Sequence, residues 1–342
     1  MTRHVTLDCA VLQPPRPEGE LIEIVPGILW LRMPLPMALN HINLYLVRND
    51  EGWMIVDTGL DTTETRNLWD SILAGLDAPV NALLCTHNHN DHCGLAGWLT
   101  GKLHVPFYMS RASFLSLRGW NRAPDNIPWE HLAYYHRLGM DEATVENIFA
   151  KLRNMLFLHA PPAAYQRLTE GKVVRIGADR WRVILGDGHA PEHASLYCEE
   201  RGILLCGDQL LGRITPNVTV YPMEPEENPL KCWLHSLQRF EDLPADTLVL
   251  PAHEMPFKEP ARRARELREH HWRMLERTRG LCETGGPQSA TALMKELFPR
   301  RKGPVDDLLA VGETMAHLVY LVEAGQLRRT PDAGGVELFH LP

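Results

Sequence analysis

The sequence predicts an α+β protein, in which short apolar strands and amphipathic helices follow one another along the chain. Three observations lead to this class. Short apolar runs bounded by Gly, Asn and Asp recur between residues 42 and 250. Residues 110–160 interrupt them with apolar residues at helical spacing. After residue 258 the chain is predicted to form helices and then a small hairpin.

The predicted strands are short apolar segments separated by turn residues. Residues 42–47 and 53–56 flank Asn-Asp-Glu-Gly, a composition that predicts a β-hairpin. Residues 80–85 form another apolar run, which predicts a buried strand. Four further strands are expected at residues 181–185, 195–198, 203–206 and 247–250.

Two helices are predicted beside these first strands. Asp61 and Glu64 match a capping box and open a helix that runs through Leu73 and ends at Gly75. A second helix should follow Asp91, where the next apolar residues share one helical face.

Residues 110–160 are predicted to be a helical insertion. The segment 129–138 is rich in aromatic residues and histidine. The segment 145–156 carries Val145, Ile148, Phe149, Leu152, Met155 and Leu156 at helical spacing. Such an insertion serves either as a lid over a site or as an ordinary surface pair of helices, and both interpretations stay open.

The C-terminal region differs from the rest in charge and pattern. Residues 258–302 carry 12 Lys or Arg and 6 Asp or Glu, a net charge of +6, which leaves −14 for the remaining chain. A basic helix at 260–279 is followed by Gly285-Gly286-Pro287, two more helices near 291–297 and 311–324, and short segments at 327–329 and 336–339. The sequence therefore predicts a larger domain at 20–257 and a small winged-helix-like module at 258–342.

Composition excludes several classes of protein. The 342 residues are 44% apolar and 23% charged, as expected for a globular chain rather than a disordered one. The sequence contains no run of 18 apolar residues and no apolar signal segment before Glu20, so neither a membrane span nor secretion is expected. Seven dispersed cysteines without a CxxC pair favour reduced thiols in the cytoplasm. A net charge of −8 disfavours nonspecific nucleic-acid binding by the whole surface.

The segment 85–94, Cys-Thr-His-Asn-His-Asn-Asp-His-Cys-Gly, carries the strongest chemical signal. It lies where a predicted strand ends and a helix begins. His87 and His89 are two residues apart in an extended loop, so their side chains point to the same side and can share one ion. Asp91 and His92 follow at the turn into the helix and can face a second ion. Imidazole and carboxylate groups suit zinc, iron or manganese.

Five short motifs follow one another along the chain, each after a predicted apolar strand. They are residues 56–59 (Val-Asp-Thr-Gly), 87–92, 188–193 (Gly-His-Ala-Pro-Glu-His), 206–208 (Cys-Gly-Asp) and 251–254 (Pro-Ala-His-Glu). In this order they resemble the motifs of the metallo-β-lactamase superfamily, in a glyoxalase II-like or lactamase-like branch of hydrolases with a C-terminal winged-helix-like extension. The resemblance implies an αββα sandwich with two metal ions at one edge of two packed sheets.

The resemblance also implies a ligand set. One ion would be held by His87, His89 and His189, and the other by Asp91, His92 and His253. Asp208 would bridge the two ions, and Asp57 would orient ligands through hydrogen bonds. Asp91 and Asp208 are the expected catalytic residues, and Asp91 would also steer the nucleophile and accept a proton. The expected ions are two divalent metals, zinc first, with iron or manganese also compatible.

Other residues near the motifs are expected to have different roles. His193 matches a motif position that holds no metal, so a structural role is expected. Glu192 stands where many relatives have glycine, which affects the local turn but removes no ligand. His41 is expected near substrate rather than metal. Three cysteines in apolar strand contexts should be buried thiols: Cys85, Cys93 and Cys206.

The chemistry implied is hydrolysis by a metal-bridging hydroxide of a small ester, thioester or lactone, so thioesterase and lactonase activities are both expectations. The alternative is a metal-dependent endoribonuclease that uses the basic module at 258–342 against phosphates. A mononuclear iron oxidoreductase of the same fold fits less well, because seven ligands favour two metals. A small-molecule substrate and no membrane partner are also expected. The C-terminal module either helps to shape the substrate mouth or mediates formation of a homodimer, and both interpretations stay open.

Overall fold

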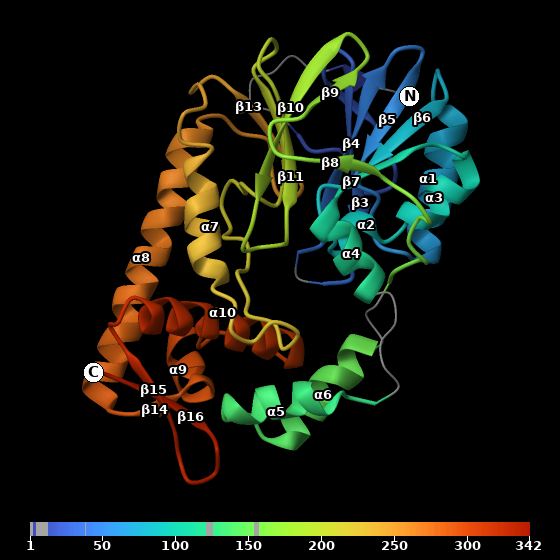
Figure 1. Ribbon diagram of the computed structural model, residues 1–342. Coiled ribbons are helices and arrows are strands. Elements are labelled where there is room, and N and C mark those ends of the chain that lie inside the picture. The colour runs from blue at the N-terminus through green and yellow to red at the C-terminus, as the bar shows by residue number, and fades with distance from the viewer. Residues whose placement is uncertain (1–2, 5–12, 38, 121–125, 154–156) are drawn as a thin grey trace. The chain divides into compact units, whose positions relative to one another are not determined.

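The computed structural model describes residues 3–4, 13–37, 39–120, 126–153 and 157–342 (Figure 1). The chain divides into two compact units, each discontinuous in sequence. Unit 1 comprises Met1–Arg122, Phe157–Pro216 and Arg239–Arg263. Unit 2 comprises Ala123–Leu156, Asn217–Gln238 and Ala264–Pro342. Met155 and Leu156 of the predicted insertion lie outside the described residues.

Unit 1 is built on two β-sheets. The first has eight strands in the order of the sequence, antiparallel from β2 to β5 and parallel from β5 to β8. The strands are β1 (Arg3–His4), β2 (Ile22–Val25), β3 (Ile28–Pro34), β4 (His41–Asn49), β5 (Gly52–Val56), β6 (Val80–Leu84), β7 (Phe107–Ser110) and β8 (Gln166–Leu168).

The second sheet has five strands in the order β13-β12-β11-β10-β9. Neighbouring strands are antiparallel except β12 and β13, which are parallel. The strands are β9 (Val173–Ile176), β10 (Asp179–Gly186), β11 (His193–Cys198), β12 (Ile203–Gly207) and β13 (Leu248–Pro251).

The two sheets lie face to face, as Figure 1 shows, and a common apolar core fills the space between them. Trp30 of β3 and Tyr45 of β4 meet Trp181 of β10 in this core. Because side chains alternate along a strand, the neighbours Leu44 and Leu46 point to the opposite face of the first sheet. The first sheet is therefore buried on both faces, which explains its continuous apolar strands.

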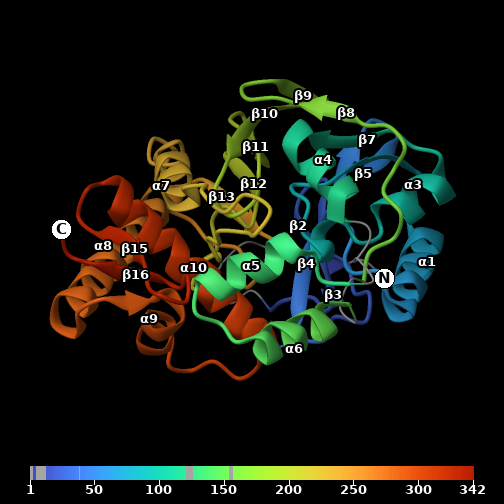
Figure 2. The same ribbon diagram turned by 60° about the horizontal axis from the view of Figure 1, so that its bottom comes forward.

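Helices cover the outer face of the first sheet (Figures 1 and 2). They are α1 (Thr63–Gly75), α3 (Ala96–Leu103) and α4 (Arg111–Trp120), with the short α2 (Asn90–Cys93) before α3. Trp69 of α1 and Leu99 of α3 are fully buried against this face. A helix layer on two packed sheets confirms the predicted fold class.

The start of α1 differs in one detail from the prediction. Thr62, and not Asp61, caps the helix: the Thr62 side chain accepts a hydrogen bond from the Thr65 amide. The Asp61 carboxylate instead forms an ion pair with Arg66, with Nε and Oδ1 2.7 Å apart. A capping-box pattern does not distinguish two adjacent oxygen-bearing side chains, since either can reach the same amides.

Unit 2 is mainly helical. Its long helix α10 is apolar on most of its surface and packs against α6, α7 and α9, with the contact to α6 visible in Figure 2. Gly312 allows close approach of Thr219, since a Cβ at this position would collide with the threonine side chain. The helices are α5 (Trp129–Arg137), α6 (Glu142–Arg153), α7 (Pro229–Gln238), most of α8 (Pro260–Gly285), α9 (Ala290–Leu297) and α10 (Pro304–Glu323).

A three-stranded sheet, β14 (Gln288–Ser289), β16 (Glu337–His340) and β15 (Arg328–Pro331), completes unit 2. Helices followed by a hairpin match the predicted C-terminal module. The compact units differ from the predicted segments 20–257 and 258–342, which stay a prediction. Unit 1 extends to Arg263. Residues 123–156 and 217–238 group with the C-terminal module, because α6 and α7 bury their apolar faces on α10. The lid role of residues 110–160 stays a prediction.

Among the described residues, no helix combines the length and the apolar character that crossing a membrane requires.

Candidate metal centre

The ends of the strands in unit 1 carry the polar residues of the five motifs. Asp57 follows β5, and the segment 86–89 follows β6 and leads into α2. His189 follows β10, Asp208 follows β12 and His253 follows β13. Strand pairing therefore brings together side chains that are separated by up to 196 positions in the sequence, from Asp57 to His253.

The structure brings His87, His89, His189 and Asp208 into one group, in which the potential ligand atoms lie within 4.8 Å of one another. His87 Nε2 lies 2.9 Å from His89 Nδ1. His189 Nε2 lies 3.3 Å from Asp208 Oδ2. Three imidazoles and one carboxylate at this spacing are a donor set for a transition-metal ion.

A second group consists of Asp91, His92 and His253, again with potential ligand atoms within 4.8 Å. His92 Nε2 lies 3.7 Å from Asp91 Oδ2, and His253 Nε2 lies 3.4 Å from the same oxygen. Asp208 also reaches this group, since its Oδ2 is 3.4 Å from His92 Nε2 and its Oδ1 is 3.4 Å from His253 Nε2. Asp208 thus contacts both groups with one carboxylate.

Hydrogen bonds at Nδ1, on the side of the ring away from Nε2, fix the orientation of several histidines. Asp57 Oδ2 lies 2.8 Å from His92 Nδ1, and Asp57 Oδ1 accepts from the Thr86 amide at 2.7 Å. The Thr86 hydroxyl contacts His87 Nδ1 at 3.0 Å. His253 Nδ1 donates to the His41 carbonyl at 3.0 Å. These contacts hold Nδ1 of three rings, so their Nε2 atoms remain available for a metal.

The electrostatics of the two groups differ. Burial lowers the pKa of His89 to about 3 and also lowers that of His87. Burial opposes the charge of His253, but the carboxylates of Asp208 and Asp91 outweigh it and raise the pKa to about 10. His92 likewise has a raised pKa, because the same carboxylates outweigh burial.

The residues present fit two metal ions. His92 Nε2 and Asp208 Oδ1 are buried and have no hydrogen-bond partner among the described residues. Buried polar atoms are normally paired, so these two atoms indicate that a ligand completes their coordination. The donor set of imidazole and carboxylate suits a divalent transition metal.

Since His253 and His92 are protonated at neutral pH without metal, binding must displace their protons. We expect about two protons to be released per chain at pH 7, and metal affinity to fall as the pH is lowered. Calorimetric titration in buffers of different ionisation enthalpy measures this number. Metal binding that releases no proton would contradict the assignment of these two histidines.

His193 stands apart from both groups. It is fully buried, and its Nε2 accepts a hydrogen bond from the Asp208 amide at 3.1 Å. This contact holds the backbone of Asp208, which agrees with the structural role expected from the sequence.

Replacing His193 by alanine should leave most of the bound metal in place, whereas replacing His189 by alanine should remove metal. The reason is that His189 offers a ligand atom to the first group and His193 does not. Metal analysis of the two purified variants distinguishes them. Equal losses in both would show that the third motif is wrongly assigned.

Two positioning contacts were not predicted from the sequence. Thr86 links Asp57 to His87, and its place directly before the first metal-loop histidine could have indicated it. Glu192 has a φ of 46° and its carboxylate accepts from the Ala112 amide at 2.8 Å. This bond ties the loop of His189 to the first turn of α4, a long-range contact that no local pattern indicates.

The remaining predicted residues lie close to the groups. The ring of His41 accepts a hydrogen bond from the Glu254 amide at 3.3 Å, and its expected contact with substrate stays a prediction. Three cysteines are confirmed as buried thiols, each with a pKa raised by burial: Cys85, Cys93 and Cys206.

Comparison with known proteins decides the family. Residues 38–253 match the family described as "Metallo-beta-lactamase superfamily". The chain belongs to this superfamily. Residues 275–341 also match "Metallo-beta-lactamase-like, C-terminal domain", which covers most of the predicted C-terminal module. The protein is thus a metallo-hydrolase of the metallo-beta-lactamase superfamily with an additional C-terminal domain.

Two solved structures resemble nearly the whole chain. A beta-lactamase domain protein from Burkholderia ambifaria is 37% identical, with a TM-score of 0.88, over 98% of this chain and 96% of that one. A metallo-beta-lactamase family protein from Thermus thermophilus is 34% identical, with a TM-score of 0.79, over 93% of this chain and 100% of that one.

Curated relatives are more distant. The "Probable metallo-hydrolase YqjP" of Bacillus subtilis is 23% identical over 304 residues, which are 85% of this chain and 91% of the relative. An "Atrochrysone carboxyl ACP thioesterase" of Aspergillus fumigatus is 22% identical over 216 residues, 63% of this chain and 38% of the relative.

Proposed function

We propose that the protein is a dinuclear metal-dependent hydrolase of a small ester, thioester or lactone, with a thioester as the favoured substrate. The observation that carries the proposal is the convergence of seven side chains into two adjacent groups that share Asp208. The thioesterase among the relatives supports the choice of thioester.

In this proposal His87, His89 and His189 hold one divalent ion, Asp91, His92 and His253 hold the other, and Asp208 contacts both. When bound, two such ions supply a nucleophilic water-derived oxygen at neutral pH and polarise the carbonyl oxygen of the substrate. Zinc is the expected metal, and iron or manganese suits the same donors.

Asp91 and Asp57 have separate roles in this proposal: Asp91 interacts with the attacking water, and Asp57 orients the His92 ring. The histidines of the second group outweigh the effect of burial and lower the pKa of Asp91 to about 2, so Asp91 is a carboxylate at neutral pH. A carboxylate at this position can accept a hydrogen bond from the attacking water. Asp57 fixes the His92 ring through its 2.8 Å contact with Nδ1.

The alternative of an endoribonuclease relies on the basic segment 258–302, and the contacts of its arginines with other groups of the protein weaken this alternative. Many of its arginines contact carboxylates or carbonyl oxygens of the protein itself, which reduces the charge available to phosphates. Such contacts are made by Arg262 with Glu259, Arg263 with the Leu211 carbonyl, Arg277 with the Glu296 carbonyl and Arg301 with Asp307.

The test is a parallel assay of metal-replete protein on acyl thioesters, simple esters, lactones and a labelled single-stranded RNA. His87→Ala is the control for contaminating enzymes. Turnover of a thioester, ester or lactone that disappears in this variant supports the proposal. RNA cleavage that disappears in the variant, without turnover of the small substrates, would overturn it in favour of the nuclease.

Neutralising exposed arginines of α8 separates the same two functions. We expect Arg262→Gln, Arg265→Gln and Arg273→Gln together to change thioester turnover by no more than about twofold, since exposed ion pairs contribute little. Binding of RNA measured against salt concentration gives the second readout. Each lost phosphate contact would lower the slope of log K against log salt by about one.

A further inference from the structure

A separate cluster of metal-type side chains lies in unit 2. His270 and His271 of α8 and Glu313 of α10 each offer a ligand atom, and these atoms lie within 4.8 Å of one another. His271 is fully buried, whereas His270 and Glu313 are half-buried. None of the five motifs in unit 1 includes these residues.

A chain of hydrogen bonds fixes the tautomer of His271. His317 Nδ1 lies 2.8 Å from the Glu313 carbonyl, which can only accept, so Nδ1 carries the proton. His317 is fully buried, and with its proton on Nδ1 its Nε2 is an acceptor. His271 Nδ1, 3.4 Å from that Nε2, is therefore the donor.

This order of donors and acceptors leaves the lone pair of His271 Nε2 inside the protein without a hydrogen-bond donor from the described residues. With its proton on Nδ1, the neutral His271 ring carries its lone pair on Nε2. His271 Nε2 is buried and has no hydrogen-bond partner within the described part of the chain. A histidine whose Nδ1 is held by a neighbour and whose Nε2 is unpartnered has the arrangement found in metal-binding histidines.

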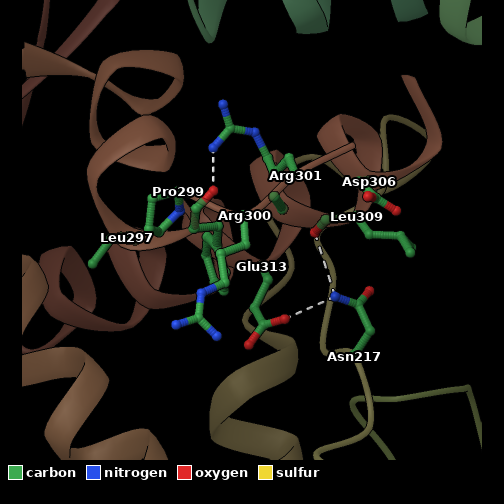
Figure 3. A pocket seen from close by; sticks show the side chains of 10 residues that line it. Asn217, Leu297, Pro299, Arg300, Arg301, Asp306, Leu309 and Glu313 are labelled. Atoms are coloured by element: carbon green, nitrogen blue, oxygen red, sulfur yellow. Dashed lines mark hydrogen bonds between the residues drawn. The ribbon is translucent and has the colours of Figure 1, made fainter. Parts of the chain in front are cut away.

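The Glu313 carboxyl group supplies the oxygen ligand of the cluster. Its Oε2 accepts from the Asn217 side-chain amide at 2.8 Å, a neutral donor, as Figure 3 shows. Burial raises the pKa of Glu313 to about 7. Glu313 also lines a cavity of about 420 Å³ in unit 2.

We propose that His270, His271 and Glu313 bind one divalent transition-metal ion, separate from the centre in unit 1, that joins α8 to α10. Two imidazoles and a carboxylate are a donor set for zinc, and three protein ligands leave the fourth tetrahedral position to water. His317 is a positioning residue for this site, because it holds His271 Nδ1. The ion stabilises unit 2, since a ligand that binds the folded state alone opposes unfolding.

Metal stoichiometry of the full-length protein tests the proposal. The protein is saturated with Zn²⁺, freed of excess by gel filtration and measured by native mass spectrometry. Wild type should retain one more ion per chain than Glu313→Gln, a variant that keeps the size of the side chain. His235→Asn, which changes an exposed histidine of α7, is the matched control and should retain the wild-type number.

Equal metal content in wild type and Glu313→Gln would overturn the proposal. A second measurement guards against a folding defect in that variant. In a His87→Ala, Asp208→Ala background, Zn²⁺ should raise the Tm, and adding His270→Ala should abolish the rise while leaving the metal-free Tm nearly unchanged. A rise that survives His270→Ala would also contradict the site.

Discussion

Replacing Asp208 by alanine should remove metal from both groups and lower thioester turnover by about 10³-fold or more. Asp208 is the residue that contacts both groups, through 3.3 and 3.4 Å distances to His189, His92 and His253. Its loss also leaves the raised-pKa histidines His92 and His253 without their main counter-charge. Metal ions contribute several kcal/mol to the stability of a transition state, and each 1.36 kcal/mol corresponds to a factor of ten.

The measurement is metal content and turnover of the purified variant, with Asp242→Ala as the control. Asp242 is an exposed aspartate of unit 1, so its replacement should change neither quantity. Asp208→Ala protein that keeps both ions and full turnover would show that this carboxylate does not join the two groups.

Replacing Asp57 by asparagine should weaken metal binding by about 10–100-fold, although Asp57 is not in either group of potential ligands. The asparagine carbonyl can still accept from the Thr86 amide, as Asp57 Oδ1 does at 2.7 Å. The amide nitrogen that replaces Oδ2 cannot accept from His92 Nδ1. The His92 ring then loses both its fixed orientation and its negative partner.

Asparagine is chosen because Asp57 has a φ of 62°, a conformation that alanine adopts only with strain. The matched control is Asp50→Asn, at an exposed position with a φ of 53°. Metal affinity is measured by competition with a chelator. An unchanged affinity for Asp57→Asn would show that this hydrogen bond does not support the metal centre.

The motif residues could be predicted because the sequence signals that mark them lie close to them in the chain. Each motif follows an apolar strand, and parallel and antiparallel pairing places the strand ends together. His87, His89, Asp91 and His92 also lie within six residues, so their proximity needs no knowledge of the fold.

Other elements were not predicted, for physical reasons. Alternate side chains of the strands in 22–34 point into two different apolar cores, one on each face of the sheet. Ile28–Pro34 therefore lacks the alternation of apolar and polar residues that marks a strand with one face in water. The strands β7 and β8, of four and three residues, form through parallel pairing rather than local preference. The helix Pro229–Gln238 has proline at its first position and an apolar face, a signal that could have been used.

Long-range contacts were beyond sequence patterns. The bond between Glu192 and the Ala112 amide joins residues 80 positions apart. The packing of Glu142–Arg153 on Pro304–Glu323 moves the insertion into the same unit as the C-terminal module. The basic charge of α8 suggested nucleic acid, whereas the structure shows several of its arginines paired internally.

The most direct test of the central claim is thioester turnover as metal-free protein is titrated with Zn²⁺. The titration uses the Glu313→Gln variant, so that metal at the proposed site in unit 2 does not contribute. We expect no turnover without metal and a rise that levels off when both groups in unit 1 are filled, at about two ions per chain. Turnover that is full without metal, or unchanged by it, would contradict a dinuclear metal-dependent hydrolase.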